Sequence, residues 1–499
     1  MKIRKFFSVF IFMLALGVNF PGWGDQLPLT EFWSFTGVHN ETLNFDLYGV
    51  PGSPAVGGDG TVYAGSLNGC FLALYPDGNL KWVNVDLGGG FGDAPAIADN
   101  GIIYASNAYD LFAFDPDDGS ILHCYGAPCQ FAGAPAIAKD GTVYIGSNSG
   151  RLFAFTPELE KKWEFFGELS LYHRPEESIF ANPVIGVDGN IYCIQERGRV
   201  ENGLLVVESA VLHSITPDGE PGPWRWFEYS LRAHIPPAIA GDSIYVAGIY
   251  NLVHSVSIAQ GTLNWSQGMM YSGSNSPGAP VIRADGTVYV AFGDVLYGLH
   301  PTDGTSVHTH VWPEQEIGSI STPAIGAGGK IYFGTYGSSA GEFWGRIYCI
   351  SPGNDYLQVD GQVHSSPAIV KDGNQGVLFL GCGNSLSAFI VESPGIARSP
   401  WPMDRANLRR NARVSYSLIQ MLLASREKVI ACNFPENIKT SLVSKLAAAQ
   451  QSLEKEKVNP AKNQVEAFIN EVRALKNKKI MAQDADSLIN SAQRIVSFL

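Results

Sequence analysis

Four polar residues that stand shortly before repeated prolines could do chemistry if the fold brings them together: Asp93, Asn182, His234 and His364. A carboxylate, an amide oxygen and imidazoles can bind a metal ion or transfer a proton. A calcium site needs about six or more oxygen ligands that include carboxylates, and this set contains a single Asp. His234 and His364 both lie three residues before a proline and are more simply hydrogen-bonded structural residues. We therefore predict no metal site and no catalytic residue among them.

Two further stretches suggest ligand loops but lack a part that the chemistry requires. The glycine-rich run 88–92 would need a following helix whose amides face a phosphate, whereas a strand-like sequence follows it. Asp115, Asp117 and Asp118 lack the closing Glu of a calcium loop. In other copies of the repeat described below, their slot holds Pro-Asp-Gly turns. Neither stretch is expected to bind a ligand.

Cysteine usage leaves one local disulfide open. The seven cysteines are Cys70, Cys124, Cys129, Cys193, Cys349, Cys382 and Cys432. Cys124 and Cys129 flank an expected outer hairpin, where a disulfide and two free thiols both fit the spacing. The others fall mostly within expected strands, where small buried thiols are the simpler interpretation. No CxxC pair indicates a zinc site.

The elements that must position these residues belong to a repeat that occurs eight times. Each copy has Pro with Ala or Val and an aliphatic residue, then a Gly turn, an aliphatic-aromatic pair, a second apolar run and often a Trp. The anchoring prolines are Pro54, Pro95, Pro135, Pro183, Pro237, Pro280, Pro323 and Pro367. Their spacings of 40 to 54 residues are typical of a four-stranded propeller blade.

The copy at 133–163 shows why each repeat predicts a blade. Its four short β-prone runs are separated by Gly, Asp, Asn and Pro, and Asp140-Gly141 suits a tight turn with positive φ. An isolated four-stranded sheet cannot bury both of its apolar faces, so neighbouring blades must stack until the ring closes. We predict an all-β eight-bladed propeller of four-stranded antiparallel blades over residues 31–397, followed by a small all-α domain.

Closure of the ring is also visible in the sequence. The last copy offers no clear fourth strand after Phe389, while residues 31–35 stand alone before the first copy. This orphan run resembles the fourth strands that carry Trp82, Trp163 and Trp265. We predict that the segment around Trp33 completes blade eight and removes the open edges that promote aggregation.

Two insertions lengthen the third and fourth spacings, to 48 and 54 residues, and insertions in repeat proteins lie in loops on one rim. We interpret their polar and aromatic residues, with those of a milder insertion near residue 344, as a candidate partner surface; ordinary solvated loop residues are the alternative. The candidates are Tyr172, His173, Arg174, Glu176, Glu177, Arg197, Arg199, Trp224 and Trp344.

The first 24 residues predict a secretory signal peptide. Lys2, Arg4 and Lys5 precede an apolar run over 6–18, and Pro, Gly and Trp follow. A membrane anchor is the alternative, but the run is shorter than the about 20 residues that a span needs. No cysteine near the run could accept a lipid. We expect an exported protein, periplasmic or extracellular, without a transmembrane span in the mature chain and not a lipoprotein.

The C-terminal part differs in charge and in period. Residues 1–397 carry a net charge of −21 and residues 398–499 a net charge of +8, so the basic run 398–415 is expected to dock on the acidic propeller. Because the basic run is expected to dock on the propeller and the protein is expected to be exported, we do not expect a nucleic-acid partner. From 416 to 499, apolar residues recur at three- and four-residue intervals, which indicates three amphipathic helices, or four with 417–430.

The repeat, with its Pro-Ala opening, Asp-Gly hairpin and closing Trp, resembles the quinoprotein-type propeller, whose repeats are named for pyrroloquinoline quinone (PQQ). The tail over 438–496 resembles the FIMAH domain, a helical module of exported bacterial proteins with a binding or attachment role. In the dehydrogenases of the propeller family, the resemblance implies a quinone on the axis, a calcium ion, an Asp base and often a vicinal disulfide. This chain has no adjacent cysteines.

We therefore expect an exported, non-enzymatic binding protein that uses its rim loops, with no cofactor and with a protein or a cell-surface glycan as partner. One alternative is a dehydrogenase that depends on PQQ and calcium. A second alternative is a scaffold of outer-membrane assembly that resembles BamB, from which this chain departs by lacking a lipid-accepting cysteine and by its helical tail.

Overall fold

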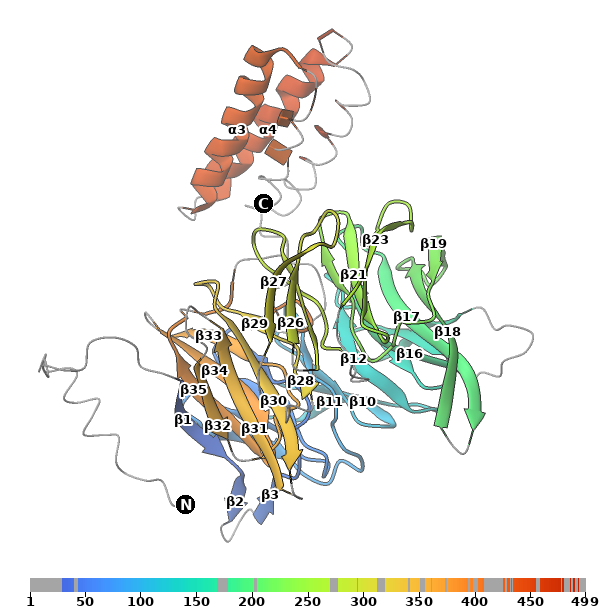
Figure 1. Cartoon of the computed structure of the whole chain (residues 1–499), viewed down its shortest axis with the longest axis vertical. Coiled ribbons are helices and arrows are strands. Elements are labelled where there is room, and N and C mark those ends of the chain that lie inside the picture. Colours follow the sequence, from blue (N-terminus) through green and yellow to red (C-terminus); the bar gives the residue numbers. More distant parts are fainter. Residues whose placement is uncertain are drawn as a thin grey trace, which may run out of the picture. The chain divides into compact units, whose positions relative to one another are not determined.

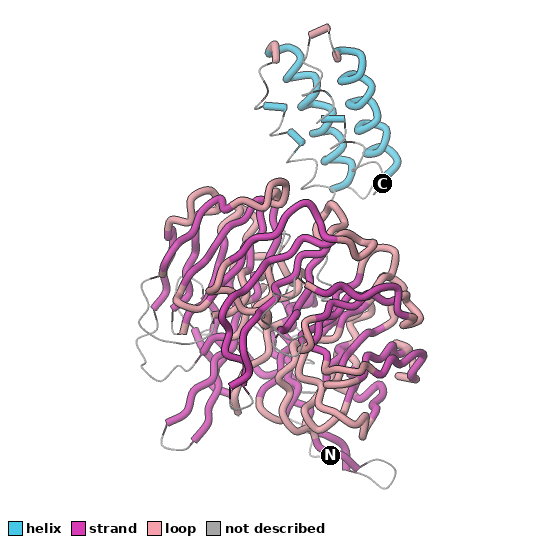
Figure 2. Tube along the Cα trace, turned by 90° about the vertical axis from the view of Figure 1, so that its right-hand side faces the viewer, coloured by secondary structure: helices cyan, strands magenta, loops and turns pink. Residues whose placement is uncertain are grey.

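The computed structural model describes residues 29–39, 44–167, 178–201, 204–269, 277–293, 295–311, 319–339, 342–350, 355–359, 361–372, 375–393, 395–397, 403–407, 425–426, 429–430, 432, 434–454, 458–476, 478–479, 485, 488–489 and 492. The chain divides into two compact units, 1–414 and 415–499, which are described separately. Figure 2 shows that strands build the first unit and helices the second.

The first unit is an eight-bladed propeller of four-stranded antiparallel blades, as predicted. Blades 1 and 2 comprise β4 (Ala55–Val56), β5 (Val62–Gly65), β6 (Phe71–Leu74), β7 (Leu80–Asn84), β8 (Ala96–Ile97), β9 (Ile103–Ser106), β10 (Asp110–Phe114) and β11 (Ile121–Gly126). Blades 3 and 4 comprise β12 (Phe131–Ile137), β13 (Val143–Ser147), β14 (Arg151–Phe155), β15 (Lys161–Phe166), β16 (Ser178–Ile185), β17 (Ile191–Glu201), β18 (Leu204–Ile215) and β19 (Pro221–Phe227).

The second half of the ring repeats this plan. Blades 5 and 6 comprise β20 (Ala238–Ala240), β21 (Ser243–Gly248), β22 (Leu252–Ser257), β23 (Leu263–Gly268), β24 (Val281–Ile282), β25 (Val288–Phe292), β26 (Val295–Leu299) and β27 (Ser306–Val311). Blades 7 and 8 comprise β28 (Ser319–Ile320), β29 (Ala324–Ile325), β30 (Ile331–Ser339), β31 (Glu342–Ile350), β32 (Asp355–Val359), β33 (Ala368–Asp372), β34 (Gln375–Cys382), β35 (Ser385–Val391) and β1 (Thr30–Phe35). A small hairpin, β2 (Gly37–His39) with β3 (Asn44–Asp46), follows β1.

The core lies between the blades, because each sheet is apolar on both faces. All residues of β5, β6 and β13 are buried, whereas the outer strand β19 alternates between exposed and half-buried positions. A middle strand that is covered on both faces favours continuous apolar runs, and an outer strand with one face in water favours alternation. The first strand of each blade lines the ring axis, and the fourth lies at the periphery.

Tryptophans in the fourth strands tie each of several blades to the next. The indole Nε1 of each donates a hydrogen bond to a backbone carbonyl in the third-to-fourth turn of the following blade: Trp33 to Pro76, Trp82 to Pro116, Trp163 to Pro217, Trp224 to Ile258 and Trp265 to Pro301. In each turn a left-handed glycine lies under the ring; a Cβ on Gly119 would stand 2.5 Å from the Trp82 ring. The glycine thus serves both the turn and the packing of the indole.

The ring closes between the first strand and the last copy of the repeat, which confirms the prediction. β1 pairs antiparallel with β35, with Trp33 opposite Ala388 and Glu31 opposite Phe389. Figure 1 shows β1, in blue, beside the orange strands of blade 8. The Trp33 ring also lies 5.8 Å from the Phe379 ring, centroid to centroid.

The ring has two faces, which differ in the strand connections that they carry. Successive strands run in opposite directions, so first-to-second and third-to-fourth turns share one face, here called the turn face. Second-to-third hairpins and blade-to-blade connections share the other, here called the loop face. On the loop face the two kinds of connection hydrogen-bond to each other, as Leu67 N does to Tyr48 O (3.0 Å) and Ile249 N to Ser230 O (2.7 Å).

In the second unit, α3 (Glu436–Glu454) and α4 (Val458–Leu475) confirm two of the predicted amphipathic helices. Their core includes Leu442 and Leu446 from α3 and Phe468 and Val472 from α4, all fully buried. Of the third predicted helix, the described residues Leu488, Ile489 and Ala492 belong to the same core. Across the described residues, no helix combines the length and apolar character that a membrane crossing requires. The FIMAH resemblance of this unit stays a prediction.

We predict that Trp33→Ala lowers the free energy of unfolding of the propeller by about 2–4 kcal/mol, since it removes a packed ring and the hydrogen bond that closes the circle. Phe32→Ala is the matched control, because Phe32 lies in the same strand but is 44% exposed; it should change stability by less than about 0.5 kcal/mol. Urea unfolding followed by tryptophan-independent far-UV circular dichroism measures both. Equal effects of the two variants would contradict the closure role of Trp33.

Candidate functional site

The chain that follows the last blade runs along the ring axis. After β35, Gly395 and Ala397 pair with the innermost strand of blade 7: Ala327 N donates to Gly395 O (2.8 Å), and Ala397 N donates to Ile325 O (2.7 Å). The inner edge of that strand faces the axis, so this segment lies on the axial side of the blade. We call residues 395–397 and 403–407 the axial strap.

Arg405 of the axial strap bridges two blades at the axis. Its side chain is almost completely buried, with 1% exposed. Nη2 donates to the carbonyl oxygens of Ala134 (3.0 Å) and Pro135 (2.6 Å) in β12, and Nη1 lies 3.4 Å from Asn182 Oδ1 in β16. The planar guanidinium suits several carbonyl acceptors at once, which a lysine could not match. The basic run 398–415 was expected to dock on the acidic propeller; of this run the structure describes residues 403–407, and there Arg405 contacts backbone carbonyls.

The backbone of the axial strap is strained at this contact. Arg405 and Ala406 have φ values of 58° and 72°, in the left-handed region that residues other than glycine rarely adopt. Ala406 N donates to Met403 O (3.1 Å), and Met403 is fully buried in the core of blades 7, 8 and 1. Such strain persists only where surrounding contacts determine the conformation. The contacts of Met403 with the core of blades 7, 8 and 1 and of Arg405 with blades 3 and 4 therefore hold this part of the strap in place.

Asp93 lies within the electrostatic reach of Arg405. Desolvation raises the pKa of the Asp93 carboxyl, Arg405 opposes this rise, and Asp404 reinforces it; the Gly133 amide also hydrogen-bonds to the carboxylate. A calcium ion beside Asp93 would lie near the fixed guanidinium cation of Arg405, and Asn182 Oδ1 already accepts from Ala134 N (3.0 Å). These residues do not fit a calcium ion or an anionic quinone held through calcium.

A second polar pair lies next to this site. Glu196 is buried, and its Oε1 accepts from Ala233 N (2.6 Å) and lies 4.0 Å from His234 Nδ1. Burial raises the pKa of the Glu196 carboxyl against the opposing effects of the Ala233 amide and Arg232, and burial lowers the pKa of His234. Asn182 Nδ2 donates to the His234 carbonyl (3.0 Å). Asp93 and Asn182 therefore lie near Arg405, and His234 contacts Asn182 through its backbone carbonyl.

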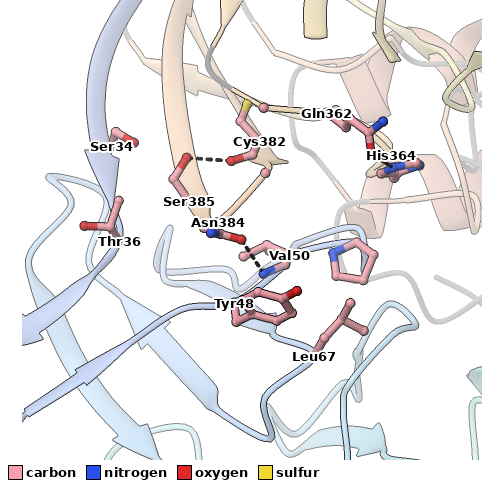
Figure 3. Close-up of a pocket in the computed structure, with 14 residues that line it drawn as sticks. Ser34, Thr36, Tyr48, Val50, Leu67, Gln362, His364, Cys382, Asn384 and Ser385 are labelled. Atoms are coloured by element: carbon pink, nitrogen blue, oxygen red, sulfur yellow. Dashed lines mark hydrogen bonds between the residues drawn. The ribbon is translucent and has the colours of Figure 1, made fainter. Parts of the chain in front are cut away.

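The fourth axial candidate, His364, lies in a pocket at the seam of blades 8 and 1. Its Nε2 pairs with Gln362 Oε1 (3.1 Å), and burial lowers the pKa of the imidazole. Figure 3 shows His364, Gln362, Asn384 and Tyr48 around this pocket, which has a volume of about 670 Å³. Across the described residues, no three His, Cys, Asp or Glu side chains are placed to share a metal ion.

Arg197, a candidate for the partner surface, is instead buried in blade 4. Its Nη2 donates to Gln195 Oε1 (3.0 Å), the same oxygen that pairs with His213 Nε2 (2.9 Å). His213 packs against the rings of Phe165 and Phe180. Position 197 follows β-strand alternation in a strand of 11 residues, so its side chain turns inward and not to a loop.

Trp224 lies in β19 and makes the inter-blade contact described above, with its ring stacked on Tyr192 at 5.6 Å. It therefore serves the packing of blades 4 and 5 and does not project from a loop. Arg199 and Trp344 lie in β17 and β31, and their side chains lie outside the described residues. Tyr172, His173, Arg174, Glu176 and Glu177 also lie outside the described residues.

The disulfide candidate is not formed, because Cys124 and Cys129 are both free thiols in the structure. Cys124 is exposed in β11, while its neighbour Tyr125 packs on Phe155 with ring centroids 4.6 Å apart. Cys129 packs against the same core as Tyr125. Adjacent strand residues point to opposite faces, so the two thiols lie on different sides of the strand.

The loop face carries exposed apolar side chains. Tyr48, Leu67, Tyr109, Tyr229 and Tyr250 lie in its connections with 65%, 49%, 53%, 61% and 68% of their surface exposed. The rings of Tyr229 and Tyr250 lie 6.0 Å apart. On the turn face, by contrast, Asp59, Asp140 and Asp285 accept the amide two residues on and so stabilise their own turns. The two faces thus differ in what they offer to a partner.

A sequence model of the family described as outer membrane protein assembly factor BamB matches residues 30–210 and 207–352. The structure of BamB from Moraxella catarrhalis is 12% identical, has a TM-score of 0.50, and the match covers 73% of this chain and 99% of that one. A europium-containing methanol dehydrogenase is 13% identical, with a TM-score of 0.55 and coverages of 73% and 87%. A quinohemoprotein alcohol dehydrogenase from Comamonas testosteroni is 14% identical, with a TM-score of 0.52 and coverages of 75% and 78%. At these identities the likeness concerns the fold alone, and no curated protein matches the chain.

We predict that Arg405→Met lowers the free energy of unfolding by about 3 kcal/mol, because it leaves buried carbonyl acceptors without their charged donor. Arg405→Lys should lower the free energy of unfolding by less than Arg405→Met does, since one ammonium group replaces only some of the hydrogen bonds of the planar guanidinium. Arg225→Met, at an exposed position of β19, is the control. Urea denaturation measures all three, and an unchanged Arg405→Met midpoint would show that the axial contact does not stabilise the ring.

A second prediction concerns acid stability. Desolvation, with Arg197 and Arg225, lowers the pKa of His213 from 6.5 to about 3. Between pH 6.5 and about 3, His213 is protonated in the unfolded chain but neutral in the folded chain. The free energy of unfolding should therefore fall as the pH drops through this range. His213→Gln should flatten this slope in urea titrations at successive pH values. His123→Gln, at an exposed position of β11, is the control and should leave the pH dependence unchanged. If His213→Gln showed the same pH dependence as the wild type, His213 would not be its source.

Proposed function

This chain belongs to the family described as outer membrane protein assembly factor BamB, and from this premise we propose that it is an exported, non-enzymatic binding protein that holds a protein partner on its loop face. The quinoprotein-type repeat that its sequence resembles agrees with this membership. The fold hosts both binding proteins and dehydrogenases, so the proposal has to rest on the residues of the site.

The observation that carries the proposal is the group of exposed tyrosines on the loop face. Tyr48, Tyr109, Tyr229 and Tyr250 each expose more than half of their surface. Tyrosine combines a large apolar ring with a hydroxyl and loses little conformational entropy when it is covered, which is why it is enriched at the centres of protein interfaces. The backbone beneath Tyr250 is fixed, since Ile249 N and Met269 N both hydrogen-bond within the loop face.

The dehydrogenase alternative depends on the ring axis. There Arg405 is bound to two carbonyl oxygens and Asn182, and its charge also acts on the Asp93 carboxyl. A quinone and calcium would have to displace the axial strap, together with Met403, from a buried position. This arrangement supports a ring that acts through its faces, and we propose that the protein works without a bound cofactor.

The BamB alternative concerns the identity of the partner. The family description names outer-membrane protein assembly, so a component of that process is one partner class that the loop face could hold. We propose export on the basis of the family and of the predicted signal peptide, which lies outside the described residues. A cell-surface glycan as the partner of the rim loops remains part of the proposal, although Trp224 no longer supports it.

The test is site-specific photo-cross-linking in whole cells. A photoreactive phenylalanine analogue at Tyr250 should capture a discrete partner, and the same analogue at Tyr75, which is 45% exposed on the turn face, should not. In a Tyr229→Ala/Tyr250→Ala variant with a cross-linker at Tyr109, recovery should fall by about tenfold with an unchanged melting temperature. Equal capture from both faces would contradict the proposal. Dye reduction that requires added PQQ and calcium would establish the dehydrogenase instead.

A further inference from the structure

The pocket at the seam of blades 8 and 1 is formed only when the ring closes. Its walls come from β1 (Ser34) and Thr36, from the segment that leads into blade 1 (Tyr48 to Pro51), from the loop before blade 8 (Gly361 to His364) and from the hairpin of blade 8 (Cys382 to Ser385). We propose that this pocket is a binding site for an uncharged saccharide unit; it shares Tyr48 with the tyrosine surface of the proposed function but contains neither Tyr229 nor Tyr250.

Charge is the first argument for the ligand class. Among the fourteen described residues that line the pocket there is no Lys, Arg, Asp or Glu. Burial lowers the pKa of His364, which favours its neutral form. An ionic ligand, such as a phosphate, a uronate or a quinone carboxylate, would lose hydration without meeting an opposite charge. A neutral ligand avoids this cost.

The polar groups of the pocket suit hydroxyl groups. Asn384 accepts from Gly49 N through Oδ1 (2.9 Å), and within the described residues its NH2 group, which carries two donors, has no acceptor. Gln362 is arranged in the same way, with Oε1 bound to His364 and its NH2 group available in the described part of the chain. The hydroxyls of Ser34 and Thr36 lie on the opposite wall in Figure 3. Paired amide donors and hydroxyls match the vicinal hydroxyls of a sugar ring.

An apolar wall completes the match. Tyr48 and Leu67 are 65% and 49% exposed and lie side by side at one edge of the pocket (Figure 3), which Pro51 also lines. If the C–H face of a sugar ring packed on Tyr48 and Leu67, it would remove this apolar surface from water. Small-molecule sites combine such apolar walls with a few placed polar groups in volumes of about 300–1,000 Å³, and this pocket has about 670 Å³.

The walls are held in place before any ligand arrives. Gly383 N donates to Gln362 O (2.8 Å), and Val50 N donates to Gly383 O (2.9 Å), so three segments are joined across the seam. Leu67 N donates to the backbone carbonyls of Tyr48 and Gly49 (3.0 Å each). Because these bonds use the backbone, removal of the Tyr48 side chain would leave the pocket intact. Preorganised walls reduce the entropy that binding has to overcome.

The test uses the purified full chain and saturation-transfer difference NMR with neutral methyl glycosides of glucose, galactose and N-acetylglucosamine. At least one glycoside should receive saturation at its ring C–H protons, and glucuronate should not. Tyr48→Ala should weaken the binding by about tenfold, as expected for the loss of a stacking ring. Tyr75→Ala, on the turn face, should leave it unchanged. Leu67→Ala provides a second lining variant, with an expected smaller loss.

Co-sedimentation with an insoluble neutral polysaccharide separates recognition of a chain from recognition of a single unit, and binding in either arm supports the proposal. Absence of binding in both arms would overturn it, as would equal binding of glucuronate or an undiminished signal from Tyr48→Ala. Binding of short apolar peptides in place of every saccharide would also overturn it. These outcomes are independent of the cross-linking at Tyr250, so each proposal can fail alone.

Discussion

The structure depends on one repeated contact, the hydrogen bond from a fourth-strand indole to the carbonyl of the next blade's turn. A blade buries its two apolar faces only against its neighbours, so the relative rotation of adjacent sheets has to be set by something specific. The indole does this, because its N–H can reach a single carbonyl while its ring covers a glycine that has no Cβ. Trp33 makes the same contact from the opposite end of the chain, with Pro76, and so extends the rule across the closure.

Closure by the first strand has a consequence for the axis. Since β1 supplies the fourth strand of blade 8, the chain that leaves β35 is free to turn inward. It pairs with the innermost strand of blade 7 and then places Arg405 between blades 3 and 4. The same topological choice therefore closes the circle at its rim and ties opposite blades together at its centre.

Because the axial strap occupies part of the axis, we propose that the protein binds its partners at the loop face and at the closing seam. Its structural relatives include dehydrogenases as well as BamB, and their shared fold does not decide between these functions. Our proposal rests on a few residues: the Arg405 guanidinium at the axis, and the neutral amides and hydroxyls in the seam pocket. Arg405 and the two pocket amides, Gln362 and Asn384, lie in segments outside the regular strands.

Period and turn chemistry determined the eight blades, the position of the Asp-Gly turns and the return of Trp33 to the last sheet, because each of these is written in residues that are close in sequence or repeat at fixed spacing. The inward face of Arg197, the opposite faces of Cys124 and Cys129, and the role of Trp224 required the exact strand register, since a shift of one residue reverses every side chain. The meeting of Arg405 with Asn182, 223 positions apart, was decided by tertiary structure alone. No local pattern records such a pair, because it exists only after the ring has closed and the strap has entered its axis.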